Sequence, residues 1–254
     1  MNRTGLTVAL GIAAVVGVLF GLYPQLDLRI SQRFYEVVDS AHNVFALRIN
    51  PALMLAREIG LWVETVLILP AIAALVLKLL LPQRKLLMSG RAIIFLIATL
   101  TLAPGLMANV ALKSYWGRPR PIDVAQFGGD QHFVAWWDPR GDCPGNCAFV
   151  SGDVSGAFWT IAPATLAPPQ WRALAYGAAL ALGVGVAALR IMAGAHFFSD
   201  AVFAGVFTFL IIWMVHGLIY RWSYTRLTDE GVESALERVS LSITAIFKGR
   251  KSEL

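Results

Sequence analysis

The chain has 254 residues, of which 57% are apolar and only 15% are charged, and its mean hydropathy is +0.64. An average soluble domain carries roughly 25% charged residues, so this composition excludes an ordinary soluble enzyme. The formal net charge of +5 does not indicate a nucleic-acid partner, because most of the excess lies in loops beside apolar segments. Two cysteines are too few for a disulfide-stapled fold or a four-ligand zinc site.

Hydropathy predicts an all-α, polytopic membrane protein. A bilayer core about 30 Å thick is crossed by about 20 apolar helical residues, and six runs approach that length. The first run is predicted to be a retained helix rather than a signal peptide, because it is too long and no small-x-small cleavage pattern follows it. The six predicted spans are residues 5–23, 61–81, 92–112, 152–167, 173–192 and 197–222.

The distribution of cations predicts the orientation. Of the 21 Lys and Arg residues, 12 fall on one side of the predicted bundle. The positive-inside rule places that side, and with it both termini, in the cytoplasm. We expect the membrane to be a bacterial inner membrane. Residues 1–222 then form a six-span membrane domain with a periplasmic loop at 122–148, and residues 223–254 form an amphipathic cytoplasmic tail on the inner leaflet.

Three features lie near the first two spans. Residues 26–38 alternate apolar and charged side chains, which predicts a helix lying in the membrane interface. Arg57 and Glu58 are interpreted as an interfacial ion pair. Glu64 lies one to two turns deeper, where a carboxylate is costly, so we expect it to face other helices or the mouth of a site.

Polar residues converge where four predicted helix ends meet on the periplasmic face. Several cations in one pocket repel each other unless an anion is present, and arginine and lysine match the oxygens of a phosphate. The start of the fourth span adds free backbone N–H groups, to which an anion can bind. The candidate site consists of Lys113, Arg118, Arg120, Ser151, Gly152, Asp153, Arg190, His196 and Asp200.

His196 and Asp200 are four residues apart at the start of a predicted helix. They share one face, so we expect Asp200 to accept a hydrogen bond from one ring nitrogen of His196. The other nitrogen is then free to act as a base or a nucleophile. Taken alone, such a pair is more typical of helix capping; beside the cations it indicates a catalytic site.

The order and spacing of these residues resemble the type 2 phosphatidic acid phosphatase superfamily. Its signature is Lys-x6-Arg-Pro, then Pro-Ser-Gly-His, then Ser-Arg-x5-His-x3-Asp. The first part is complete, the second departs at both ends, and the third lacks only its serine. The matching segments are Lys113 to Pro121, Val150-Ser151-Gly152-Asp153, and Leu189-Arg190 through His196 to Asp200.

The resemblance implies a mechanism without a metal or any other cofactor, because cations replace the metal that neutralises charge elsewhere in phosphoryl transfer. His196 attacks phosphorus to form a phosphohistidine, and Asp200 orients it. Arg118 is an additional cation, which either binds a second phosphate or is a solvated loop charge. The phosphate oxygens are held by Lys113, Arg120, Arg190, Ser151 and the amide of Gly152.

Asp153 departs from the family, in which a histidine protonates the leaving oxygen. The positive charges of Lys113 and Arg190 favour the ionised form of Asp153, and a carboxylate is a poor proton donor. Three explanations remain open: burial keeps Asp153 protonated, another group such as His132 donates the proton, or the leaving group needs little help, as in a lipid diphosphate. An inactive relative of the family is a further alternative.

The loop at 122–148 is expected to roof the site. It contains Cys143 and Cys147, which an oxidising compartment allows to form a disulfide just before the second motif.

The sequence therefore predicts an inner-membrane lipid phosphatase with a periplasm-facing active site and no evident obligate protein partner. Candidate substrates are a lipid A phosphate, a polyprenyl diphosphate, phosphatidylglycerol phosphate and phosphatidic acid, and the first two rank slightly higher. An intramembrane serine hydrolase using Ser151 and His196 leaves the cations without a purpose. A lipid-phosphate binder or flippase explains the cations but not the pairing of His196 with Asp200.

Overall fold

The computed structural model describes residues 3–39, 42–223 and 227–251, so residues 224–226 and 252–254 of the predicted tail lie outside the described residues. The described chain is predominantly helical and confirms the predicted all-α membrane fold. Five helical segments in it are long and apolar enough to cross a membrane. They are α1 (Arg3–Leu22), α3 (Pro51–Leu80), Gly90–Tyr115, α8 (Pro169–Met192) and Phe198–Arg221.

Two of these segments change their helical form along their length. The segment Gly90–Tyr115 consists of α4 (Gly90–Leu100), the π-helix η2 (Thr101–Leu112) and α5 (Lys113–Tyr115). The segment Phe198–Arg221 consists of α9 (Phe198–His216) and the π-helical turn η5 (Gly217–Arg221).

The predicted fourth span is a short, broken pass. It consists of α6 (Gly152–Trp159) and α7 (Ile161–Leu166), which meet at Thr160. Almost every residue of α6 is buried, because η2, α8 and α9 pack around it. The Phe158 ring lies so close to Gly183 and Gly205 that a Cβ at either position would approach it within 3 Å. Small residues on the neighbouring helices therefore let α6 sit at the centre of the bundle.

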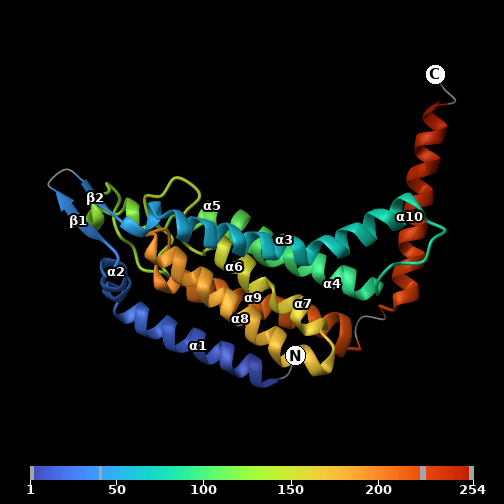
Figure 1. The fold of residues 1–254 in the computed structure, drawn as a ribbon, viewed down its shortest axis with the longest axis horizontal. Coiled ribbons are helices and arrows are strands. Elements are labelled where there is room, and N and C mark those ends of the chain that lie inside the picture. Colours follow the sequence, from blue (N-terminus) through green and yellow to red (C-terminus); the bar gives the residue numbers. More distant parts are fainter. Residues whose placement is uncertain (1–2, 40–41, 224–226, 252–254) are drawn as a thin grey trace.

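The chain passes back and forth between the two ends of the bundle (Figure 1). One end carries α2 (Gln25–Gln32), the start of α3, α5, the end of α8 and the starts of α6 and α9. Between α5 and α6 the loop there contains the short 3-10 helices η3 (Pro121–Asp123) and η4 (Ala125–Phe127). The start of α1 and helix α10 (Asp229–Lys251) lie at the opposite end. The helix ends that carry the candidate residues thus gather at one end, as the alternation of spans predicts.

The predicted interfacial helix at 26–38 is wrong in its second half. Helix α2 ends at Gln32, and β1 (Glu36–Asp39) then pairs antiparallel with β2 (His42–Val44). The 3-10 helix η1 (Ala46–Ile49) leads from this hairpin into α3. Val37 and Val38 are β-branched and fit a strand better than a helix, which the alternation of apolar and charged residues does not reveal.

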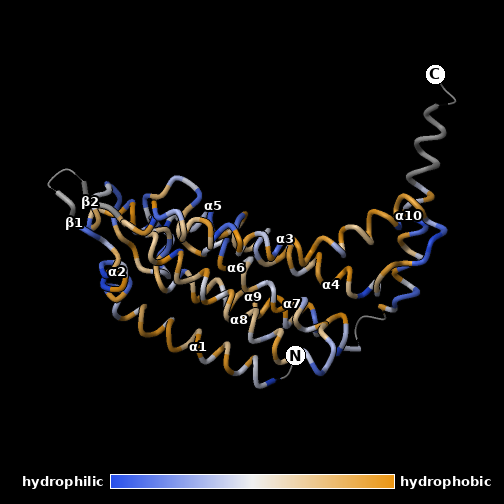
Figure 2. Tube along the Cα trace, in the orientation of Figure 1, coloured by the Kyte–Doolittle hydropathy of each residue, from blue (hydrophilic) through white to orange (hydrophobic). Residues whose placement is uncertain are grey.

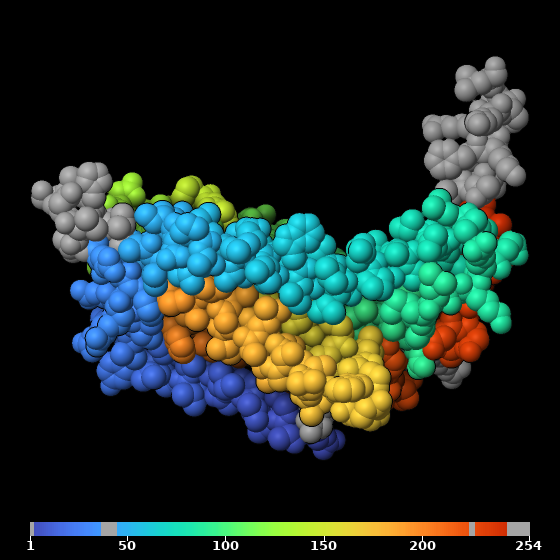
Figure 3. Space-filling model, viewed as in Figure 1, coloured from blue at the N-terminus to red at the C-terminus, as the bar shows by residue number. Residues whose placement is uncertain are grey.

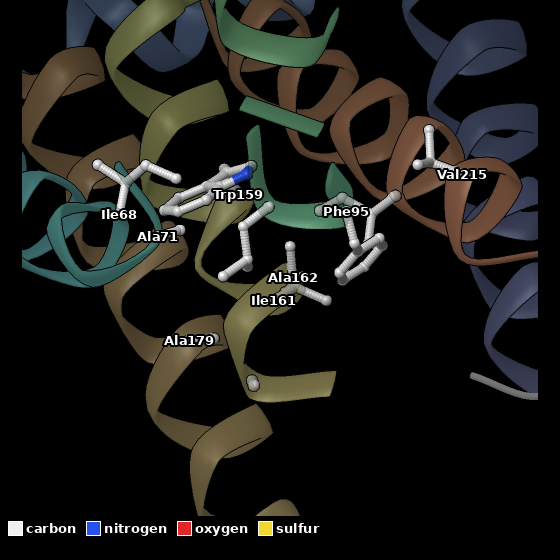
Figure 4. Packing of buried hydrophobic residues seen from close by; sticks show 11 residues of the cluster. Ile68, Ala71, Phe95, Trp159, Ile161, Ala162, Ala179 and Val215 are labelled. Atoms are coloured by element: carbon white, nitrogen blue, oxygen red, sulfur yellow. The ribbon is translucent and has the colours of Figure 1, made fainter. Parts of the chain in front are cut away.

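Apolar side chains cover both the core and the outer surface of the bundle. Inside, Trp159 is fully buried beside Phe95 and Ile161, and its indole N–H donates to Thr99 Oγ1 at 2.9 Å (Figure 4). Outside, Val15 and Val184 are 66% and 62% exposed. Hydrophobic colour follows the long helices, and hydrophilic colour gathers at the two ends (Figure 2). This arrangement suits lipid as the surrounding solvent.

The helix of the C-terminal tail contacts the ends of α3 and α4. Val232 is 4% exposed and lies against Gly90, where a Cβ would come within 2.7 Å of it. The Lys78 ammonium donates to Glu233 Oε1 at 3.1 Å. The first turns of α10 are thus held by protein contacts at the end of the bundle remote from the candidate site.

Candidate active site

Lys113 and the start of α6 form the floor of the site. A Cβ at Gly152 would lie 3.0 Å from Lys113 Nζ and 2.3 Å from Asn109 Oδ1, so only glycine fits here. Ser151 caps α6, its buried hydroxyl accepting a long bond from Val154 N–H at 3.4 Å. The ammonium of Lys113 therefore lies against a helix N-terminus, where an anion can accept hydrogen bonds from both.

The π-helix η2 determines which side chains reach this floor. Pro104 lies inside it, has no N–H to donate, and would clash with the preceding turn of a regular α-helix. Asn109 and Lys113 are four residues apart, so they share one face of the helical segment, and both face Gly152. Asn109 was not identified from the sequence, because it belongs to none of the motifs.

A cleft opens beside this floor, between the first turns of α3 and the end of α8, which lie against each other in the space-filling view (Figure 3). Its volume is about 180 Å³. Its walls combine apolar side chains with an excess of cations over anions. The lining includes Arg48, Arg57, Arg120, Arg190 and Glu58, together with Leu47, Leu53, Met54, Leu189, Ala193 and Ala195.

Asp153 connects two of these arginines. Its Oδ2 accepts from Arg57 Nε at 2.7 Å and lies 3.3 Å from Arg190 Nε. Two guanidinium groups on one oxygen favour the ionised carboxylate over the acid. The interpretation of Arg57 and Glu58 as an interfacial pair is therefore incomplete: Arg57 does bind Glu58, at 2.9 Å, but it also belongs to the site.

His196 lies in the turn between α8 and α9 and is 1% exposed. Its Nδ1 is 2.7 Å from the carbonyl oxygen of Ala148. A carbonyl only accepts, so Nδ1 carries the proton and Nε2 keeps a free lone pair. Burial, followed by the charges of Arg190, Lys113 and Arg120, lowers the pKa of His196 well below its usual value near 6.5. The imidazole is therefore neutral and suited to nucleophilic attack.

The expected hydrogen bond between His196 and Asp200 is wrong. The Asp200 carboxylate accepts from the Phe197 backbone N–H at 2.7 Å and pairs with Arg118 Nη1. The carbonyl of Ala148 takes the place expected for Asp200 in fixing the tautomer of His196. Asp200 instead acts on His196 indirectly, because it fixes the backbone of Phe197, the residue that follows the histidine.

Both expectations for Arg118 are also wrong, since its guanidinium group is outside the cleft lining and is buried between carboxylates instead of being solvated. It is 0% exposed and pairs with Asp200 and with Asp27 Oδ2, the latter at 2.8 Å. Asp27, on α2, also accepts from the Ser199 N–H and hydroxyl. We call Asp27, Arg118, Ser199 and Asp200 the buried cluster. It ties α2, the loop and α9 together behind His196.

The loop before α6 holds Arg120. Arg120 Nε and Nη2 donate to the carbonyl oxygen of Asn146 at 3.1 and 2.7 Å. Asn146 lies within the short ring that the Cys143–Cys147 disulfide closes. His132 lies away from the cleft lining: its side chain is 89% exposed and its Nδ1 is 3.1 Å from Asp142 Oδ2. This placement does not favour His132 as a proton donor.

Glu64 faces the bundle interior. A Cβ on Gly156 would lie 2.0 Å from Glu64 Oε2, so the carboxyl group packs directly on α6, one turn below Asp153. The described residues contain no group of three or more His, Cys, Asp or Glu side chains arranged to hold a metal ion.

The chain is similar to known membrane phosphatases in sequence. Residues 92–226 match the model of the PAP2 superfamily. This range contains the positions of all three signature motifs. The chain is 33% identical over 226 residues to the lipid A 4'-phosphatase of Francisella tularensis subsp. novicida, covering 87% of this chain and 98% of that protein. It is 39% identical over 106 residues to the lipid A 4'-phosphatase of Rhizobium leguminosarum, covering 42% and 46%. No solved structure shows significant similarity. The chain therefore belongs to the PAP2 superfamily and is a membrane lipid phosphatase.

Proposed function

We propose that the substrate is lipid A and that the protein hydrolyses a phosphate monoester on it. The observation that carries the proposal is the 33% identity over almost the whole length of a lipid A 4'-phosphatase. The cleft supports it, because arginines beside apolar walls suit a lipid headgroup that joins phosphate to acyl chains.

The reaction proceeds in two steps. His196 Nε2 attacks phosphorus, the N–P bond forms, and the bond between phosphorus and the sugar oxygen breaks. Water then attacks the phosphohistidine, releases inorganic phosphate and returns the histidine to its neutral form. Lys113, Arg120, Arg190 and the Gly152 amide stabilise the charge that spreads over the phosphoryl oxygens in both steps.

The leaving oxygen needs a proton, and Asp153 is a poor source of it. Its carboxylate is engaged by Arg57 and Arg190. We assign the proton to a water molecule in the cleft. The leaving group from lipid A is a sugar hydroxyl, which leaves less readily than a phosphate and therefore needs this proton. The expected preference for diphosphates, whose leaving group needs little help, does not apply to this substrate.

The site is proposed to face the periplasm of the inner membrane. The sequence assigns 12 of the 21 Lys and Arg residues to the opposite side, which supports cytoplasmic termini under the positive-inside rule. The disulfide in the loop beside the site is consistent with an oxidising compartment.

The test is phosphate release by the purified protein in detergent from lipid A, with phosphatidic acid, phosphatidylglycerol phosphate and a polyprenyl diphosphate as competitors. We expect lipid A to have the highest kcat/KM and to lose the mass of one phosphate group. The variant His196→Ala should be inactive, and His132→Ala, which changes an exposed histidine, should be fully active. A higher kcat/KM for any of the other three lipids would contradict the proposed substrate.

A further inference from the structure

Arg57 contacts the site's Asp153 and, among the described residues that form an ion pair with it, comes from outside the family signature. It lies on the second turn of α3, before residues 92–226, which match the family model. Its Nε donates to Asp153 Oδ2 at 2.7 Å, and its Nη1 donates to Glu58 Oε1 at 2.9 Å. Two carboxylates therefore fix the plane of this guanidinium group at the wall of the cleft.

The negative charge of Asp153 opposes phosphate binding, and Arg57 can neutralise it. The position holds a carboxylate at the N-terminus of α6, close to where a phosphate dianion must bind. Like charges at short range in a partly buried site oppose binding. Asp153 also contacts Arg190, a residue that the signature assigns to phosphate. Without a second cation, the carboxylate both repels the substrate and withdraws Arg190 from it.

Arg57 and Arg190 contact the Asp153 carboxylate at different distances. Arg57 makes the shorter contact with Oδ2, whereas Arg190 Nε lies 3.3 Å from the same oxygen. The contact to Arg190 is an ion pair without a hydrogen bond, because Arg190 Nε has no hydrogen-bond partner within the described residues. Its N–H donors are therefore left for a phosphate.

We propose that Arg57 is a positioning residue for the phosphate site: it neutralises Asp153 and holds it so that the carboxylate aligns Arg190. The pair Arg57 and Asp153 thus occupies the position of the histidine in the family's second motif and serves binding, not proton transfer. This inference rests on the proposed phosphate-binding role of Arg190. It does not depend on which lipid is the substrate.

The test is a double-mutant cycle with Arg57→Gln, Asp153→Asn and the combination of the two. Two quantities are measured: kcat and KM for lipid A, and the inhibition or binding constant of inorganic orthovanadate. Arg57→Gln should weaken vanadate binding and raise KM by about 30-fold or more, because it leaves Asp153 charged without its nearest partner. In the Asp153→Asn background the same substitution should change both quantities by less than about 3-fold.

Arg140→Gln is the matched control, since it breaks an exposed arginine–aspartate pair with Asp138 at the same end of the bundle. It should behave as the wild type. Arg57→Lys retains the charge but not the fork, and should give an intermediate loss, which keeps the test informative if Arg57→Gln does not fold. An equal loss in both backgrounds, or no loss at all, would overturn the proposal. If the wild type binds vanadate but does not hydrolyse lipid A, the proposed substrate fails, and the vanadate cycle still decides the role of Arg57.

Discussion

Two ionic clusters flank His196, and their compositions are opposite. The buried cluster has two carboxylates around one arginine, and Asp27, Arg118 and Asp200 are each 0% exposed. The second cluster, formed by Arg57, Asp153 and Arg190, has two arginines around one carboxylate and borders the cleft. We call it the cleft cluster. The guanidinium N–H groups of the buried cluster donate to protein acceptors, whereas the cleft cluster keeps N–H donors for a ligand.

This difference separates structural charge from functional charge. A buried ion pair is satisfied by geometry, and the loss of one partner leaves an uncompensated charge in the interior. An excess of positive charge beside an open cleft is neutralised only when an anion binds there. Perturbing the buried cluster should therefore cost stability first, and perturbing the cleft cluster should cost activity first.

The largest effect is expected at the histidine between the clusters. His196→Gln removes the nucleophile and should lower kcat by at least about 10⁴-fold. Vanadate binding and the unfolding temperature should stay close to those of the wild type, because neither cluster is broken. Residual turnover within about tenfold of the wild type, measured as phosphate release, would refute covalent catalysis by His196.

The next effect is expected in the buried cluster. Arg118→Met leaves Asp27 and Asp200 buried without their cation, which should destabilise the protein by about 3–5 kcal/mol. Thermal unfolding in detergent measures this change. Activity per folded molecule should fall much less than stability. If Arg118→Met unfolds like the wild type but has lost its phosphate affinity, Arg118 belongs to substrate binding after all.

Arg190→Gln is the counterpart in the cleft cluster. It should reduce kcat/KM by about 10²–10³-fold, since it removes a donor that stabilises the transition state. The unfolding temperature should change little, because Asp153 keeps Arg57 as its partner. A large loss of thermal stability without a loss of kcat/KM would erase the distinction between the clusters.

The smallest effect concerns pH. In the proposed mechanism the neutral form of His196 attacks phosphorus, so we expect kcat/KM to be lost as pH falls through its lowered pKa. Arg120 is one of the charges that lower the pKa of His196. In Arg120→Gln that pKa rises, and the acidic limb of the profile should move to higher pH than in the wild type. Comparison with the wild type on one substrate cancels the titration of the substrate itself; an unchanged or lower limb would contradict the assignment.

The sequence predicted the residues that motifs and span alternation define, and missed those that tertiary contacts recruit. Lys113, Ser151, Gly152 and His196 come to one end because each lies at a helix end on the same side. Arg57 and Asp153 are 96 residues apart, and no local pattern relates them. Asp27 and Ser199 are 172 residues apart.

Two local misreadings have the same cause. The four-residue spacing of His196 and Asp200 allows a hydrogen bond but does not require one, and Arg118 is the stronger partner for a buried carboxylate. The sequence around Arg118 contains neighbouring prolines and glycine, which are typical of a loop, and loops are usually exposed. The packing of α2 and the start of α9 against this loop buries the side chain.

The shortness of the central pass has a consequence for depth. From Gly152 to Leu166 the pass rises about 22 Å, whereas a bilayer core is about 30 Å thick and α8 rises about 36 Å. A pass this short does not cross the core by itself, so neighbouring helix ends surround the start of α6. The end of α8 lies beside that start, because Arg190 reaches Asp153. The proposed phosphate site at Gly152 is thus bordered by protein groups, and its guanidinium groups compensate for the water that a bound phosphate loses there.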